Sequence, residues 1–281
     1  MMKKLIVLIA ISLTVSVSMA QSPWNKKKGE GFVKLSETII VSDQFYDPSG
    51  NIQPITTTGV YITSIYGEYG LSDKLTAFVY FPFFFRNTLN EQQLVNSGTT
   101  VPGDEDNSIG DTNVGISYGI KQNGPFVLNA SLLLGLPIGE TAGGDTKLLQ
   151  SGDGEFNQLV KLNAGYSFYP IPVYVIGGIG LNNRTNDFSD ELHINGEVGL
   201  TVKKSFNIAF KVYSLSSFDN GDADANQNGI FSNNTEYFAY GPELSYTYDD
   251  RIGASVTYQG ALSGQNILAN PSYSFGFHYK F

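Results

Sequence analysis

The sequence predicts an all-β protein, an antiparallel up-and-down transmembrane β-barrel of about twelve strands with short periplasmic turns and long outer loops. Three observations predict this fold: a signal for export, segments in which apolar and polar residues alternate, and connections that alternate between short and long. The composition agrees, because 15% of the 281 residues are charged, 13% are aromatic and 31 are glycine. So many aromatic and so few charged residues exclude a disordered chain. The net charge of −9 argues against nucleic acid as a partner.

Residues 1–20 have the features of a secretory signal peptide that is cleaved on export. A positively charged start precedes an apolar stretch at 5–13, and the small residues Ser18 and Ala20 stand at positions −3 and −1 of a cleavage site. The alternative is a membrane anchor, but the apolar stretch is too short for one. No later segment approaches the roughly 18 consecutive apolar residues of a transmembrane helix. We therefore expect an exported protein in the outer membrane of a Gram-negative bacterium.

The segment 21–31 follows the signal peptide and contains the single tryptophan of the chain and three consecutive lysines. Because the predicted lumen carries several carboxylates, this segment could enter the lumen as a partial plug. It could equally remain a periplasmic tail. Residues 32–281 are expected to form the barrel.

Alternation with a period of two predicts the strands, because successive side chains of a strand point to opposite faces. The expected strands, in chain order, are 32–40, 60–71, 75–85, 110–120, 126–137, 157–169, 173–184, 191–202, 206–217, 235–248, 251–262 and 271–281. The last strand alternates most strictly, with an aromatic residue at every second position from Tyr273 to Phe281. The first three and the seventh alternate less cleanly, which leaves their facing open.

The composition of the two faces distinguishes a membrane barrel from a soluble one. One face holds Leu, Ile, Val, Phe and Tyr, and the other holds mainly Gly, Ser, Thr and Asn with a few charged residues. An apolar exterior and a polar, wet interior are typical of outer-membrane barrels.

The connections between these strands alternate in length. Tight turns are expected at 72–74, 122–125, 170–172, 203–205 and 249–251. Longer polar loops are expected at 41–57, 86–109, 138–156, 185–191, 218–234 and 263–270. The loops are rich in Asp and Glu, whereas Lys gathers at the turns and termini. We expect an acidic outer rim and a basic periplasmic rim, with both termini on the periplasmic side.

The chain ends in Phe281 on an aromatic strand, which is similar to the C-terminal signal that the barrel-assembly machinery reads. This machinery and outer-membrane lipid are therefore the expected macromolecular partners, and the small-molecule solute is left unnamed.

Several phrases are similar to those of one outer-membrane family. Glu68–Leu75 (EYGLSDKL) resembles a strand–turn–strand phrase of that family, and so do Gly110-Asp111, Leu136–Gly139 (LPIG) and Leu262–Gly264 (LSG). The family is named for the phenol-degradation (MetA) pathway and is grouped with outer-membrane transporters of Gram-negative bacteria. The resemblance covers most of residues 58–281. It implies a barrel that passes solutes, among them hydrophobic or aromatic compounds.

Charged and titratable side chains on the predicted inner faces are the candidate site residues. These pore-lining candidates are Glu68, Asp111, Lys161, His193, Glu197, Lys211, Glu243 and His278, with Lys34 as a further one. Charges that face the interior of a membrane protein are usually paired or mark a solute path. Twelve strands exceed the roughly eight whose side chains fill the interior but fall short of the roughly 16–18 of open porins. We therefore expect a narrow, partly blocked polar passage.

Two functions follow from this geometry. The first is a channel or transporter for passive passage of small solutes. The alternative is a non-conducting barrel, closed by its own salt-bridged side chains, that displays acidic loops for adhesion or envelope organisation. No cofactor is expected for either function.

Enzymatic activity is not expected. Barrel phospholipases set a histidine and a serine two residues apart on the lipid-facing side of a strand, whereas here His193 is followed at that spacing by Asn195 and His278 by Lys280.

One loop nearly spells a calcium-binding pattern, D-x-[DN]-x-[DN]-G, from Asp224 through Asn226 and Asn228, with Asp222 just before it. The bidentate glutamate expected at the twelfth position is replaced by Thr235. A flexible loop of Asn, Asp and Gly is the alternative, so the loop is a weak candidate and no metal site is expected.

Overall fold

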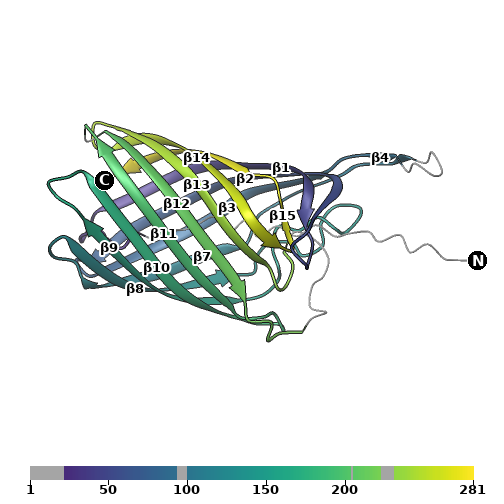
Figure 1. The fold of residues 1–281 in the computed structure, drawn as a ribbon, viewed down its shortest axis with the longest axis horizontal. Coiled ribbons are helices and arrows are strands. Elements are labelled where there is room, and N and C mark those ends of the chain that lie inside the picture. Colours follow the sequence, from purple (N-terminus) through teal and green to yellow (C-terminus); the bar gives the residue numbers. More distant parts are fainter. Residues whose placement is uncertain (1–21, 94–99, 204, 223–230) are drawn as a thin grey trace, which may run out of the picture.

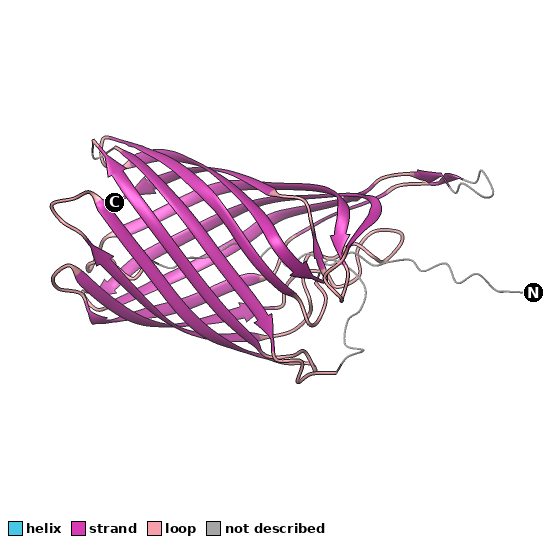
Figure 2. Cartoon of the chain, viewed as in Figure 1, coloured by secondary structure: helices cyan, strands magenta, loops and turns pink. Residues whose placement is uncertain are grey.

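The computed structural model describes residues 22–93, 100–203, 205–222 and 231–281. Twelve long strands form one antiparallel barrel (Figures 1 and 2). The barrel is closed because the first strand, β1 (Gly31–Tyr46), pairs both with its successor and with the last strand, β16 (Ser272–Lys280). The predicted fold class and the predicted number of strands are confirmed.

The strands follow the chain around the barrel, each antiparallel to its neighbours. After β1 come β2 (Ile52–Ser72), β3 (Leu75–Leu89), β7 (Thr112–Lys121), β8 (Phe126–Leu136), β9 (Asn157–Ser167), β10 (Val173–Arg184), β11 (Glu191–Val202), β12 (Phe206–Ser217), β13 (Glu236–Tyr248), β14 (Ile252–Gln265) and β16. The longer loops contain the short strands β4 (Gln92–Gln93), β5 (Thr100–Val101), β6 (Asp104–Ser108) and β15 (Ile267–Leu268). None of the residues described here forms a helix long and apolar enough to cross a membrane.

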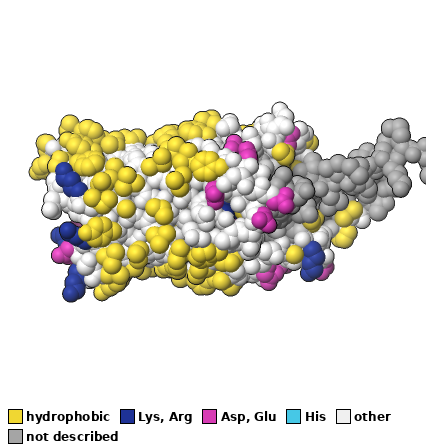
Figure 3. All heavy atoms as spheres, turned by 90° about the horizontal axis from the view of Figure 1, so that it is seen from below, with side chains coloured by type: hydrophobic (Ala, Val, Ile, Leu, Met, Phe, Trp, Pro, Cys, Tyr) yellow, Lys and Arg dark blue, Asp and Glu magenta, His cyan; other side chains and the backbone are white. Residues whose placement is uncertain are grey.

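The two ends of the barrel differ in their connections and in their charge. The end that holds the tight turns, the start of β1 and the end of β16 is called the turn rim, and the opposite end is called the loop rim (Figure 1). On the face seen in Figure 3, hydrophobic side chains spread over the wall, most Lys and Arg gather at the turn rim, and Asp and Glu lie toward the loop rim. This distribution follows the expected contrast between the rims.

The first connection is much shorter than expected. Most of the predicted loop 41–57 is strand, because β1 continues to Tyr46 and β2 begins at Ile52. The turn between them is closed by Asp47, whose carboxylate accepts backbone N–H groups two and four residues ahead, both at 2.9 Å. Pro54 and the neighbouring polar residues indicate a loop locally, but cross-strand pairing overrides that preference.

A bulge explains why the third strand alternates poorly in the sequence. Ile65 lies opposite Phe81 and Thr63 lies opposite Phe84, so three steps along β3 match two steps along β2. Even-numbered residues of β3 face inward before this point and odd-numbered residues face inward after it. A bulge inserts an extra residue without breaking the sheet, and it shifts the phase of the apolar pattern.

Glu37 is a charged residue on the outer side of the wall. Glu37 belongs to the outward set of β1 with Leu35 and Ile39, about midway along the strand. Its carboxylate accepts a hydrogen bond of 2.6 Å from the hydroxyl of Thr63 on β2, and its other cross-strand neighbour is Phe275. A single hydroxyl compensates poorly for the water that a carboxylate loses in the apolar band.

We therefore expect Glu37→Leu to raise the free energy of unfolding in lipid vesicles by on the order of 1–2 kcal/mol, because acids on the lipid face are destabilising. Guanidinium titration of the refolded barrel measures this value. Asp43→Leu, at an exposed position near the loop rim, is the matched control and should change stability much less. A destabilised Glu37→Leu variant would contradict the outward placement of this carboxylate.

Candidate functional site: the barrel lumen

The candidate residues of the sequence analysis all lie on the inner side of the wall or at its loop end. Seven of them occupy inward positions of the strands, and they are Glu68, Lys161, His193, Glu197, Lys211, Glu243 and His278. Asp111 lies directly before β7, at the loop end. The structure does not unite them in one site. They divide into an ion-pair network in the middle of the wall, a cluster near the loop rim and separate contacts near the turn rim.

The central network joins the neighbouring strands β11, β12 and β13 and reaches β1. Lys211 Nζ lies 3.2 Å from Glu243 Oε2 and 3.7 Å from Glu197 Oε2. Lys34 Nζ, across the seam between β1 and the last strands, lies 3.9 Å from the same Glu243 oxygen. Glu197 also accepts a 2.6 Å hydrogen bond from the hydroxyl of Tyr174. The two cations and two carboxylates compensate one another, so this part of the wall is polar without a strong charge of either sign.

The N-terminal segment, residues 22–30, lies against the inner wall at the turn rim. Asn25 holds it there: its side-chain amide donates to the carbonyls of Lys74 (3.0 Å) and Ser117 (2.9 Å). Its amide oxygen accepts from Asn129 Nδ2 at 3.0 Å and from the hydroxyl of Ser117 at 3.1 Å. Asn25 is therefore bonded to the turn between β2 and β3, to β7 and to β8.

Two more side chains fix the same segment. Lys26 Nζ lies 3.1 Å from Glu68 Oε2 and 5.5 Å from the centre of the Phe32 ring. Trp24 meets Tyr174 edge to face, with ring centres 6.0 Å apart. The described part of the segment therefore packs inside the turn end of the lumen and does not extend from it as a free tail.

Asparagines continue this packing into the wall. Asn163 Nδ2 donates to Asn129 Oδ1 at 3.1 Å, and Asn129 Nδ2 donates to the carbonyl of Ser22 at 3.1 Å. Both asparagine side chains are fully buried. On the side of β8 and β9, the turn half of the lumen is thus filled by the N-terminal segment and a row of amides.

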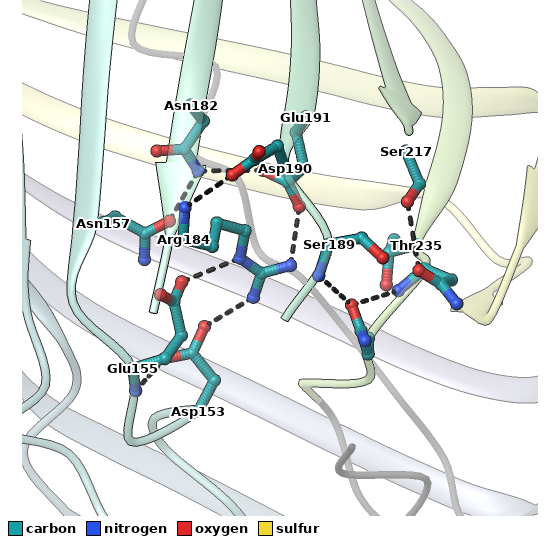
Figure 4. Close-up of polar contacts among 12 residues, drawn as sticks. Asp153, Glu155, Asn157, Asn182, Arg184, Ser189, Asp190, Glu191, Ser217 and Thr235 are labelled. Atoms are coloured by element: carbon teal, nitrogen blue, oxygen red, sulfur yellow. Dashed lines mark hydrogen bonds and ion pairs between the residues drawn. The ribbon is translucent and has the colours of Figure 1, made fainter. Parts of the chain in front are cut away.

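Near the loop rim, one arginine binds three carboxylates (Figure 4). Arg184, at the end of β10, lies 2.7 Å from Glu155, 2.8 Å from Glu191 and 3.1 Å from Asp153, each through a different guanidinium nitrogen. The Phe188 ring packs 4.4 Å from the guanidinium carbon. The arginine side chain is 3% exposed, so the cluster is a buried network with charge-assisted hydrogen bonds.

This cluster fastens the long loop 137–156 to the wall. Two of the three carboxylates, Asp153 and Glu155, belong to the loop, and Arg184 belongs to β10. Asp111, on the other side, accepts the backbone N–H of Gly139 at 2.8 Å and that of Asp153 at 3.0 Å. Burial, followed by the negative charge of Asp153, raises the pKa of Asp111 to about 7. Burial likewise raises the pKa of Glu155 to about 7, although Arg184 opposes the shift.

The cluster corrects one expectation and adds one residue that the sequence analysis did not name. Asp153, Glu155 and Glu191 were expected among the acids displayed at the outer rim, but the structure buries all three against Arg184. Arg184 itself was not among the candidates. Its sequence signal was the pattern Asn182-x-Arg184 at the end of a strand, followed by Glu191 at the start of the next.

The two histidines hydrogen-bond inside the wall. His193 Nε2 lies 3.0 Å from Glu191, and His193 Nδ1 bonds the hydroxyl of Tyr213. His278 Nε2 lies 3.2 Å from the hydroxyl of Thr247. In the described part of the chain, neither histidine has a serine as its hydrogen-bonded partner.

The calcium-loop candidate cannot be placed as a unit. Asp222 lies in the described chain, where its backbone N–H donates to Asp187 at 2.7 Å. Asp224, Asn226 and Asn228 lie outside the described residues. Within the ranges that the structure describes, there is no group of three or more side chains suited to hold a metal ion.

Inside the barrel, two cavities border the candidate residues. The larger, cavity 1, has a volume of about 370 Å³ and lies along β1, β2 and β12–β16; it extends from Phe32 and Glu68 toward Leu268 and Asn270 near the loop rim. The smaller, cavity 2, has a volume of about 170 Å³ and lies in the loop half, beside the Arg184 cluster and Lys161. These cavities are the space in which a solute could pass.

Comparison with known proteins places the fold. No protein-family model matches the sequence, and no curated protein matches it either. Among solved structures, the chain is similar to the COG4313 outer membrane channel from Pseudomonas putida F1, with a TM-score of 0.66, 13% identity, and coverage of 93% of this chain and 98% of that one.

Two porins are also similar. The NanC porin has a TM-score of 0.51, 12% identity, and coverage of 89% of this chain and all of its own. The KdgM porin in complex with disordered oligogalacturonate has a TM-score of 0.50, 11% identity, and coverage of 89% and 99%. At these identities the likeness shows the fold: a closed twelve-strand barrel of the kind found in outer-membrane channels.

We expect removal of the Arg184 charge to lower the free energy of unfolding. Arg184→Gln leaves Asp153, Glu155 and Glu191 buried without their partner, and loss of one partner from a buried network costs about 3–5 kcal/mol. We expect the free energy of unfolding to fall by that amount and hydrogen exchange in loop 137–156 to accelerate.

Arg86→Gln is the matched control, because Arg86 and Glu105 form an ion pair of 2.9 Å whose side chains are 46% and 57% exposed. An exposed pair contributes about 0–1 kcal/mol. Equal losses in the two variants would show that the Arg184 cluster does not hold the loop.

Proposed function

We propose that this protein is an outer-membrane channel for the passive passage of small solutes. The observation that carries the proposal is cavity 1, which extends along most of the barrel between side chains that lie near opposite rims. A fold shared with outer-membrane channels supports it. On this proposal the inward-facing candidates of the sequence analysis line the passage or hold its walls in place.

The wall of cavity 1 indicates which solutes fit. Hydroxyl groups surround its middle, including those of Ser36, Thr38 and Ser274, and the ion pairs there are internally compensated. Toward the loop rim the lining becomes apolar, with Ile40 and Leu268. Such a path suits small amphiphilic solutes better than strongly charged ones. The resemblance to the family named for phenol degradation supports hydrophobic or aromatic solutes.

The N-terminal segment is proposed to act as a partial plug. It fills the turn half of the lumen beside β8 and β9, where Asn25 and Lys26 anchor it to the wall. Cavity 1 passes on the other side of it, with Ser22 and Lys26 among its lining residues. The plug therefore narrows the passage and leaves one side of the lumen free.

The same plug favours the second candidate function, a non-conducting barrel that displays acidic loops. A filled turn half and a buried Arg184 cluster would serve that role too. Burial of Asp153, Glu155 and Glu191 reduces the number of exposed carboxylates at the loop rim. A non-conducting barrel does not require a space as long as cavity 1. We therefore rank the channel first.

Export and assembly complete the proposal. Residues 1–20, outside the described residues, are proposed to be the cleaved signal peptide. Phe281 is proposed to present the assembly signal: its backbone exchanges two hydrogen bonds with Gly31 at 2.8 and 3.0 Å, while its ring is exposed at the turn rim.

Recording from planar bilayers tests the channel. We expect discrete conductance steps from the refolded protein without residues 1–20, and larger steps from the double variant Asn25→Ala/Lys26→Ala. That variant removes the side-chain bonds that hold the plug. Lys28→Ala is the control, since the structure ties Lys28 to Asp73 through its backbone N–H. Silent membranes for the wild type and for the double variant would favour the non-conducting barrel.

A further inference from the structure

Among the described residues that line the two cavities, two are common to both: Tyr80 and Tyr213. We propose that these two side chains form the constriction that sets the size limit for solutes moving between cavity 2 and cavity 1. The inference rests on the proposed channel function, and it adds the residues that determine which solutes pass.

The two tyrosines come from opposite sides of the barrel. Tyr80 lies on β3 and Tyr213 on β12, and these strands are six places apart around the ring of twelve in either direction. Both side chains occupy inward positions and are buried, with 6% of each residue exposed. Two large rings that project inward from opposite walls and border the same two spaces form a partition between them.

Cavity 1 ends toward the loop rim at Ile40 and Leu268, two members of a buried apolar cluster, and cavity 2 is bordered by buried side chains toward the turn rim. Below it, on the side of β8 and β9, lie Asn129 and Asn163, both fully buried, with the N-terminal segment bonded to Asn129. On this proposal, a solute that enters cavity 2 from the loop rim crosses between the tyrosines into cavity 1.

Both rings are held in place by their surroundings. The hydroxyl of Tyr213 bonds His193 Nδ1, and its ring stacks on Tyr237 with centres 5.7 Å apart and planes 26° from parallel. Tyr80 is buried and lies opposite Tyr66 of the adjacent strand β2. A ring locked by a hydrogen bond and a stacking contact gives a defined aperture, as a selectivity element requires.

The constriction is also connected to the loop rim. His193, which bonds Tyr213, lies 3.0 Å from Glu191, and Glu191 lies 2.8 Å from Arg184. Arg184 in turn binds the two carboxylates of loop 137–156. The side chain that narrows the passage is thus positioned by the same cluster that fastens the loop.

Conductance and size exclusion test the constriction. We expect Tyr80→Ala/Tyr213→Ala to raise single-channel conductance at least twofold and to admit larger polyethylene glycols. Tyr80→Phe and Tyr213→Phe keep the rings, so they should stay close to wild type. Tyr66→Ala is the matched control, because Tyr66 lines cavity 1 alone and widening a wide part of a passage changes its resistance little. An equal gain from Tyr66→Ala would overturn the proposal.

Thiol labelling supplies a readout that does not depend on conductance. The chain has no cysteine, so Leu159→Cys places a single thiol in cavity 2. Vesicles captured through a tag after Phe281 present the turn rim outward, and trapped glutathione consumes any reagent that enters them. We expect a charged methanethiosulfonate reagent to label this cysteine at least tenfold faster when both tyrosines are alanine.

The two experiments separate the two claims. Equal labelling rates with and without the tyrosines would overturn the constriction, even if the protein conducts. A difference in labelling from a protein that never conducts would support the partition and overturn the channel.

Discussion

The structure depends on one constraint: within a membrane, every backbone N–H and C=O must find its partner inside the protein. A sheet meets this constraint only when it closes, and here closure is the pairing of β1 with β16, continued at the turn rim by the exchange between Gly31 and Phe281. Closure gives each strand an inner and an outer face. The alternating sequence, the apolar exterior and the polar lumen all follow from it. Glu37 is an exception to the apolar exterior, and its carboxylate accepts a hydrogen bond from the hydroxyl of Thr63.

A polar inner face creates a second requirement, because groups withdrawn from water need partners. Many of these groups find partners in cross-strand ion pairs, as between Lys211 and Glu243, in buried amides, and in the N-terminal segment. These partners occupy space, so the same interactions that satisfy the lumen also narrow it. On the proposed channel function, the passage is the part of the lumen that they leave free. Its shape then follows from how the polar groups are paired.

Much of the fold could be predicted from the sequence because alternation is a local property, as in the strand that ends at Phe281. The length of the β1–β2 hairpin could not be predicted, because strand pairing up to Tyr46 and Ile52 overrides the local preference for a loop. The inward direction of Glu197 and Lys211 followed from strand phase. Their pairing, and that of Arg184 with Glu155, depends on cross-strand register and on the path of a loop, which no local pattern encodes. The inward direction of Tyr80 could not be predicted, because the β3 bulge shifts the phase of an apolar run.

In the proposed channel, water and small solutes pass beside β1 inside a polar wall. Single cysteines at successive positions of β1, in a chain without native cysteine, test it most directly when a charged, water-soluble thiol reagent is applied to the barrel in lipid vesicles. We expect fast reaction at Lys34→Cys and Ser36→Cys, which line cavity 1, and little reaction at Leu35→Cys and Ile39→Cys, which face outward. Inner positions that react no faster than outer ones would contradict a water-filled passage.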